Sequence, residues 1–313
     1  MALRYLSIKA GIQHDLGLLM RLNNNMKGAA LMTGCVFAYV INDAFMKLLF
    51  SEIALFQAVF LRSIITVPPV LFMVWFTKVR IQNLAKKDKR LIWVRVGAEI
   101  CTTIAFLTAL KYMPLANVTA ILQALPLAVM MAAALFLVEP IGWRRWSAIL
   151  VGFVGVLIVV RPGLDGFNIY SLSALLAIIF ITVREIATRK LASEVPTITV
   201  VLSTAVGSAL FAGIMMIGTK WHAVSTTSWL LLTGAAFAVL IATLLSVMAM
   251  RTGEIGFVSP FRYTSMLGAI GLGILMFGQW PDQSTLAGTL IIVITGIYTF
   301  HREQKISRGV TAS

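Results

Sequence analysis

The chain has 313 residues, of which 59% are hydrophobic and only 12% are charged. This composition is far too apolar for a soluble domain and indicates a membrane protein. The net charge of +14 would suit nucleic-acid binding, but the basic residues are distributed as a membrane topology requires, so we expect no nucleic-acid partner.

Ten segments of roughly 20 apolar residues follow one another along the chain, each long enough to cross a hydrocarbon core of about 30 Å. The sequence therefore predicts an all-α integral membrane protein with ten transmembrane helices and short connections. In chain order the predicted spans are 27–48, 55–76, 91–111, 115–138, 143–161, 169–190, 197–218, 228–249, 257–277 and 283–300.

The segments outside the predicted spans define the topology. Residues 1–26 contain no uninterrupted apolar core, so we expect a cytoplasmic tail rather than a cleaved signal peptide. If the N-terminus is cytoplasmic, most of the 26 Lys and Arg residues fall on the cytoplasmic side, and only Lys111, Arg161 and Lys220 fall on the outer side. This bias, together with an even number of spans, predicts that both termini lie in the cytoplasm and that the protein lies in a bacterial inner membrane.

The hydrophobic pattern repeats once, about 141 residues further along the chain. The repeats are predicted at 27–161 and 169–303, followed by a cytoplasmic tail at 304–313. Because each repeat holds five spans, an odd number, the second copy must insert upside down. Carriers built from such inverted repeats bind their substrate between the halves, near the middle of the membrane. The residues that recur are Pro140 with Pro281, Gly155 with Gly296, and Arg161 with Arg302.

Ionisable side chains inside spans are costly, so each is a candidate for function. Asp43 and Lys47 lie one helical turn apart on one face of the first span, and Glu185 and Arg189 repeat this arrangement in the sixth. In one interpretation each pair is an intrahelical ion pair that lets a charged helix sit in lipid. In the other, the pairs form bonds between helices and act as alternating gates at the outer and inner mouths of a transport pathway.

Two further charged side chains are candidates for binding or coupling. Arg62, at a depth similar to that of Asp43, is predicted to hold that carboxylate or to bind a substrate carboxylate or phosphate through its planar fork. Glu99 is the deepest acid by position and is the first candidate for proton coupling or for binding a substrate amine. The alternative is a structural bond from Glu99 to Arg95, four residues earlier on the same face.

Two more arginines lie in or near the apolar zone. Arg184 lies nearer the centre of the sixth span than Arg189 does, and the sequence does not identify its partner. Arg262 lies close to the cytoplasmic end of the ninth span, where it is expected only to extend towards lipid headgroups.

Two prolines predict kinks at corresponding places in the halves. Pro126 in the fourth span follows Gln123, and Pro260 precedes Phe261 and Tyr263 in the ninth. Kinked helices near the middle of the membrane are where carriers commonly expose polar groups to substrate. Gln123 and the two aromatic side chains are therefore candidates for substrate contact, the alternative being that the aromatic side chains only pack. The glycines of the fifth and tenth spans are predicted to allow close helix packing; they are Gly152, Gly155, Gly288 and Gly296.

Three stretches of sequence carry a family resemblance. The first runs from the third span into the fifth, ALKYMPLANVTAILQALPLAVMMAAALFLVEPIGWRRWSAILVGFVGVLIVVRPG, and the second half echoes it as GEIGFVSPFRYTSMLGAIGLGILMFGQWPDQSTLAGTLIIVITGIYTFHRE. With ten spans in two halves, these resemble EamA-type members of the drug/metabolite transporter superfamily. The segment NDAFMKLLF, which begins at Asn42, resembles the bacterial branch that imports S-adenosylmethionine, riboflavin and other organic solutes. The resemblance covers roughly residues 27–303. It implies a ten-span transporter, and it is compatible with a homodimer because the last span of each half sometimes makes dimer contacts in this family.

Taken together, the sequence favours a secondary transporter that moves a small polar or zwitterionic organic metabolite, such as an amino acid, a vitamin or a nucleoside-like solute, by alternating access. It shows no nucleotide-binding motif, so we expect proton coupling or exchange. An exporter of drugs or metabolites with the same fold is the main alternative, and a channel or a membrane-embedded transferase is less favoured. We expect neither an enzyme nor a metal or cofactor site, because no zinc-ligand spacing or Ser/His/Asp grouping is present.

Overall fold

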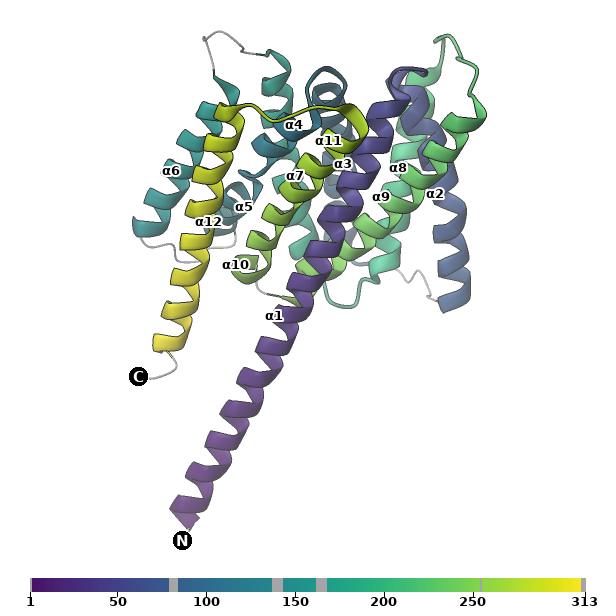
Figure 1. Cartoon of the computed structure of the whole chain (residues 1–313). Helices are drawn as coiled ribbons and strands as arrows, with labels where there is room; N and C mark the ends of the chain where they lie inside the picture. The colour runs from purple at the N-terminus through teal and green to yellow at the C-terminus, as the bar shows by residue number, and fades with distance from the viewer. Residues whose placement is uncertain (1, 79–83, 137–142, 162–167, 254, 311–313) are drawn as a thin grey trace.

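A computed structural model describes residues 2–78, 84–136, 143–161, 168–253 and 255–310 of the chain. Nearly all of these residues are helical and none of them lies in a β-strand, as the sequence predicts. The helices stand side by side in one bundle, and the first and last helices both extend from it at the same end (Figure 1).

The helices fall into two halves of matching order. The first half holds α1 (Ala2–Leu49), α2 (Leu55–Thr77), α3 (Lys86–Tyr112), α4 (Leu115–Leu122), α5 (Leu125–Phe136) and α6 (Trp143–Val160). The second half holds α7 (Tyr170–Arg189), α8 (Thr197–Met216), α9 (Thr226–Thr252), α10 (Ile255–Val258), the 3₁₀ helix η1 (Ser259–Thr264), α11 (Ser265–Phe277) and α12 (Gln283–Val310). Each predicted span coincides with one continuous helix, or with a helix broken near its middle.

Among the described residues, seven helical stretches are long and apolar enough to cross a membrane. They are α1 from Asn24 onward, α2, α3, the stretch Leu115–Phe136, α7, α8 and α9. The three other predicted spans correspond to α6, to the broken stretch α10–η1–α11, and to α12. The apolar parts of α6 and α12 are shorter, at Ile149–Val160 and Gln283–Thr295. Large apolar side chains such as Trp75 and Leu275 are exposed on the outside of the bundle, as expected for a surface that faces lipid.

The helix boundaries differ from the predicted ones at both ends of the chain. The segment predicted as an N-terminal tail is helical, because α1 begins at Ala2 rather than near residue 27. No proline interrupts this segment, and a helix that is already anchored by packing extends at little cost per residue. At the other end α12 continues to Val310, beyond the predicted end of the last span.

The two halves interlock through four helix pairs. The first helix of each half packs along the third helix of the other, so that α1 lies against α9 and α7 lies against α3. In the same way α2 packs on α8 and α6 packs on α12. Every one of these pairs joins the first half to the second, so the interface between the halves runs through the centre of the bundle.

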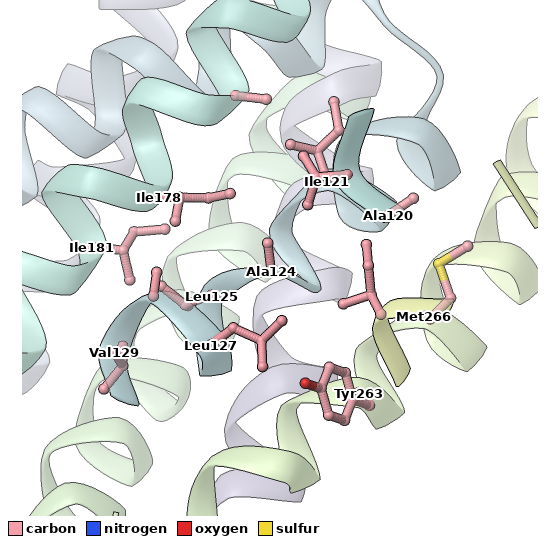
Figure 2. Close-up of a cluster of buried hydrophobic side chains, with 14 of the residues drawn as sticks. Ala120, Ile121, Ala124, Leu125, Leu127, Val129, Ile178, Ile181, Tyr263 and Met266 are labelled. Atoms are coloured by element: carbon pink, nitrogen blue, oxygen red, sulfur yellow. The ribbon is translucent and has the colours of Figure 1, made fainter. Parts of the chain in front are cut away.

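The core of this interface surrounds the break between α4 and α5. Ile121 of α4 and Leu125 of α5 face Ile178 and Ile181 of α7 (Figure 2). On the other side of the break lies Met266 at the start of α11. Apolar packing therefore holds the broken helix of the first half between elements of the second.

The contact between α6 and α12 is close enough to bring their backbones together. A Cβ placed on Gly288 would lie 2.6 Å from the carbonyl oxygen of Gly155 and 2.5 Å from Cγ2 of Val159. A Cβ on Gly155 would in turn lie 2.9 Å from the carbonyl oxygen of Gly288. Two of the glycines predicted to allow close packing thus face each other, and a Cβ on Gly152 would collide with Leu127. The surroundings of Gly296 lie outside what the structure describes.

Candidate functional site

A cavity of about 120 Å³ lies between the halves, with walls formed by α1, α2, α3, α4, α5, α7, α9 and the η1–α11 segment. A smaller cavity of about 40 Å³ adjoins it and extends between α2 and α8. The two cavities share Arg62, Glu99, Thr103 and Val239 as lining residues. Five acidic or basic side chains line the larger cavity; they are Asp43, Arg62, Glu99, Arg184 and Arg262.

A network of ion pairs closes one side of the larger cavity. Arg184 of α7 donates one hydrogen bond to Glu99 of α3 and one to Glu185, both at 2.8 Å. Nη2 of Arg262 lies 3.2 Å from the same oxygen of Glu185. The sequence predicted Glu99, Arg184 and Glu185 as site residues, and the structure brings the three together. We call Glu99, Arg184, Glu185 and Arg262 the four-residue network.

The position of Arg262 corrects the sequence-based expectation. This side chain was expected to extend towards lipid headgroups, but it is 8% exposed and lines the central cavity. Arg262 lies in η1, which packs on α1 and α12, and with η1 docked there the guanidinium of Arg262 reaches Glu185. A buried guanidinium is stable there because a buried carboxylate pairs with it.

Tyr39 is a site residue that the sequence analysis missed. It lines the larger cavity, and its ring centroid lies 5.9 Å from the guanidinium carbon of Arg184, within the range of a cation–π contact. Tyr39 precedes Asp43 by one helical turn and therefore shares its helix face. This spacing is the signal in the sequence that could have identified it.

Asp43 and Arg62 meet through a third residue, Asn42. Nη1 of Arg62 donates to Oδ1 of Asn42, and Nδ2 of Asn42 donates to Oδ1 of Asp43, each at 2.9 Å. All three side chains are buried. The predicted role of Arg62 in holding Asp43 is thus indirect, because the amide of Asn42 lies between the two charges. Asn42 was also missed, although its polar side chain inside a span next to Asp43 was visible in the sequence.

Lys47 and Arg189 bind helix ends. Nζ of Lys47 donates to the carbonyl oxygens of Leu110 and Met113, at 2.7 and 2.6 Å, where α3 ends. Nη1 of Arg189 donates to the carbonyl oxygens of Met250 and Gly253, at 2.9 and 3.3 Å, where α9 ends. The last carbonyl groups of a helix lack partners within the helix and carry partial negative charge. They therefore attract both basic side chains, in place of the acids one turn earlier on α1 and α7.

Arg95 does not form the bond to Glu99 that was considered from the sequence. Its Nε donates to the hydroxyl of Thr188 at 2.9 Å, and its Nη1 donates to the hydroxyl of Thr204. The expected alternative, a bond from Arg95 to Glu99, is thus replaced by bonds that tie α3 to α7 and α8. Glu99 is free to pair with Arg184 instead.

The fourth predicted span is interrupted beside the cavity. α4 ends at Leu122 and α5 begins at Leu125, one residue before Pro126. Gln123 lies in this interruption, lines the cavity and donates a hydrogen bond of 3.2 Å from Nε2 to the hydroxyl of Ser265. In the second half Pro260 lies in η1, at the corresponding interruption.

The two aromatic candidates of the second half lie at a different place. Phe261 and Tyr263 line an apolar groove of about 500 Å³ between the η1–α11 segment and α12. Phe261 also stacks on Phe257, with 5.9 Å between the ring centroids. Neither aromatic residue lines the central cavity as the structure describes it. No group of three or more His, Cys, Asp or Glu side chains is arranged to hold a metal ion among the described residues.

A helical membrane protein with a charged cavity between two matching halves has the architecture of a solute transporter. Residues 26–161 match the EamA-like transporter family. The S-adenosylmethionine uptake transporter of Rickettsia conorii is 26% identical over 271 residues, which cover 84% of this chain and 89% of that protein. The riboflavin transporter of Vibrio cholerae is 30% identical over 204 residues, 65% of this chain and 68% of that protein. The chain therefore belongs to the EamA-like transporter family of the drug/metabolite transporter superfamily.

Other similarities agree with this assignment. A pseudopaline exporter of Pseudomonas aeruginosa is 24% identical over 215 residues, 68% of this chain and 76% of that protein. A crystal structure of 17% sequence identity aligns with a TM-score of 0.64 over 88% of this chain and 96% of that one, which shows that the fold is shared. The Rickettsia, Vibrio and Pseudomonas relatives are bacterial proteins that are named as transporters or exporters. The chain is thus an inner-membrane transporter of a small molecule.

Proposed function

We propose that the protein is a secondary carrier that moves a small zwitterionic metabolite across the inner membrane by alternating access, with both termini in the cytoplasm. The central cavity is the observation that carries this proposal. Arginines from both halves and two acids of the first half line one space in the middle of the bundle. A solute with both charges matches such a wall, whereas a purely lipophilic cation would leave the arginines without a role.

The contacts between the halves support an inverted repeat. Gln123 and Ser265 are separated by 142 residues, the spacing that also relates Asp43 to Glu185, and they bond to each other beside the cavity. Equivalent residues meet in this way when they lie next to a two-fold axis. The reciprocal packing of α1 on α9 and of α7 on α3 agrees with the same axis. We therefore assign residues 27–161 and 169–303 as inverted copies.

The same symmetry separates contacts that persist from contacts that change. When access switches in a symmetric carrier, each half takes up the arrangement that the other half had. Contacts that both halves make at once are therefore kept in both states. The bonds of Lys47 and Arg189 belong to this kind, so we propose that these residues hold helix ends together instead of acting as gates. The four-residue network is different, because Arg184, which bonds to both of its carboxylates, corresponds to the uncharged Asn42 in the first half, and we assign the gating role to this network.

Two acids are candidates for coupling transport to protons. Glu99 is bonded to the Arg184 guanidinium, so a proton on Glu99 would break an ion pair and loosen the proposed gate. Asp43 accepts its hydrogen bond from the neutral amide of Asn42, so it can take up a proton without losing an ion pair. Exchange of one solute for another requires neither acid to titrate.

Uptake and counterflow in proteoliposomes test the proposal. The purified full chain is reconstituted with labelled amino acids, S-adenosylmethionine and riboflavin as the panel, with and without a pH gradient. We expect saturable uptake and counterflow of at least one zwitterion, with strongly reduced transport by Arg184→Gln. Arg161→Gln is the matched control, because Arg161 pairs with Asp282 outside the cavity. Non-saturable flux without counterflow would indicate a channel and contradict the proposal.

The coupling mechanism and the direction of transport follow from the same assay. If Glu99→Gln and Asp43→Asn both keep the wild-type response to a pH gradient, proton coupling through these acids is excluded and exchange remains. The relatives include both uptake and export proteins. We propose uptake, because the relative with the widest alignment given above is named for it. Net accumulation in energised vesicles of known orientation decides between the two.

A further inference from the structure

We propose that Arg62, Asn42 and Asp43 form the subsite that binds a carboxylate and a neighbouring cationic group of the transported solute. The inference rests on the carrier function proposed above. It states which wall of the cavity recognises the solute and which chemical groups the solute must carry.

The pairing of the cavity arginines distinguishes Arg62 from the others. Arg184 bonds to two carboxylates, and Arg262 lies within ion-pair distance of one. Arg62 donates to a neutral amide oxygen, and no carboxylate of the described residues lies within 4.0 Å of its guanidinium. A buried guanidinium without a counter-ion is costly. A carboxylate delivered by the solute would supply the missing charge through the planar fork that arginine offers.

Asn42 fixes the geometry of the subsite. It accepts from Arg62 through Oδ1 and donates to Asp43 through Nδ2, so both bonds are satisfied with one orientation of the amide. The amide also keeps the two charges apart, which prevents Arg62 and Asp43 from neutralising each other. A positive charge beside a negative charge, held at a fixed separation, is the complement of a zwitterion such as the amino-acid end of a metabolite.

The position of Arg62 indicates where the rest of the solute lies. Arg62 is on the wall that the two cavities share, whereas Asp43 lines only the larger one. A carboxylate on Arg62 with its cationic group on Asp43 therefore leaves the remainder of the solute in the larger cavity. There it meets Tyr39, Phe106 and Gln123, which offer two rings and one amide. This arrangement requires a carboxylate and a cationic group at one end of the solute, and it tolerates variation in the remainder.

The first test uses the wild-type protein and analogues of one solute. S-adenosylmethionine, its methyl ester and its decarboxylated form differ at the carboxylate and keep the same body. Each unlabelled compound competes with whichever labelled zwitterion the panel above identifies. We expect the two compounds that lack the carboxylate to compete at least about tenfold more weakly, the effect of losing one charge-assisted contact. Equal competition by all three would overturn the inference.

The second test uses variants at Arg62. We expect Arg62→Gln to raise the half-saturation concentration about tenfold for a solute with a carboxylate, to remove discrimination against the decarboxylated form, and to leave the maximal rate within about twofold. Arg62→Lys should restore part of the affinity, because it keeps the charge without the fork. Melting temperature and gel filtration identify a variant that does not fold, in which case the analogue series alone decides.

The remaining outcomes are also distinct. Unchanged discrimination by a folded Arg62→Gln variant would overturn the subsite. If riboflavin, which has no carboxylate, is the preferred solute, the subsite and the zwitterionic substrate class are both wrong, while transport by a secondary carrier with alternating access stands. If the wild-type protein transports no member of the panel, the carrier proposal fails and this inference fails with it.

Discussion

α1 and α7 occupy equivalent places in the two halves, and their last turns behave alike. Lys47 and Arg189 each donate two hydrogen bonds to carbonyl oxygens at the end of the third helix in their own half. These bonds supply partners to helix ends that would otherwise remain unsatisfied inside a membrane protein. Both halves make this contact, as expected for one that maintains the fold.

One turn earlier the two helices differ. Asn42 and Asp43 in α1 correspond to Arg184 and Glu185 in α7. In the α1 pair Asn42 bonds to the guanidinium of Arg62 and to Asp43, whereas both members of the α7 pair belong to the four-residue network. The halves therefore agree where helices are held together and differ where they line the cavity. Because the two halves differ at the cavity wall, the two ends of one solute would meet different polar and charged side chains.

The largest effect is expected where the halves differ most. Arg184→Gln leaves Glu99 and Glu185 buried with fewer partners, which should lower the free energy of unfolding by about 3–5 kcal/mol. At the equivalent position Asn42→Ser loses an amide that bonds to a guanidinium and to a carboxylate, so it should cost about 1.5–3 kcal/mol, the net value of a hydrogen bond to a charged group. Thermal unfolding of the purified protein in detergent measures both. Arg161→Gln, in a partly exposed pair, should cost about 0–1 kcal/mol, and equal losses for all three variants would contradict the comparison.

An intermediate effect is expected where the halves agree. Lys47→Met and Arg189→Met each remove bonds from a charged donor to two carbonyl groups, so each should cost about 1.5–3 kcal/mol. The two variants should lose similar amounts of unfolding free energy. The exchanges Lys47→Arg and Arg189→Lys, which keep a charged donor, should retain most of the wild-type stability. The same unfolding measurement applies. A large loss at one position with none at the other would show that the two contacts are not equivalent.

The smallest effect concerns a third equivalent pair, in the loops after α1 and α7. Hydroxyl groups of Ser228 and Ser225 donate to Glu52 and hold the pKa of its carboxyl below the ordinary value. For Glu194 the pKa is also lowered, by a backbone N–H group of its own residue and then by the hydroxyl of Ser193. The bonds of Glu52 tie its loop to α9, whereas those of Glu194 are local and can form in the unfolded chain.

Because both pKa values are lowered, each stabilising effect is complete above the ordinary value of about 4.3 and is lost as the pH falls through the folded-state pKa. Glu52→Gln should therefore reduce the melting temperature slightly at pH 7, with a difference from wild type that disappears in acid. Glu194→Gln should change little at any pH. Melting curves of both variants at several pH values check this, and a larger effect at Glu194 would reverse the expected order.

The sequence predicted the helices well because each span is a continuous run of apolar residues whose length can be read from the sequence alone. The predicted span 55–76 corresponds to α2, Leu55–Thr77, and the prediction of a kink near Pro126 falls where α4 gives way to α5. The partners of the charged residues depend on segments distant in the chain. Lys47 bonds to a carbonyl group 63 residues away, and Arg184 bonds to Glu99 across 85 residues. An acid four residues away is visible in a sequence, but an unsatisfied helix end brought close by folding is not.

The segment around Pro260 shows the same limit. The sequence located the interruption of the ninth span but did not indicate which side chains turn inward. In η1 the inward position belongs to Arg262, and its neighbours Phe261 and Tyr263 lie along the outer groove. Side-chain direction in a short 3₁₀ segment depends on how the flanking helices dock, which the local sequence does not fix.

The glycine contact between α6 and α12 has a consequence for how the molecule can move. Gly155 and Gly288 bring two backbones together with no room for a Cβ, so sliding along this seam would drive a larger side chain into a carbonyl group. We expect α6 and α12 to keep their spacing throughout the transport cycle, while the helices around the cavity rearrange. One edge of the protein would then present a constant profile to the surrounding bilayer, and the lipid packed there would not be disturbed at each turnover.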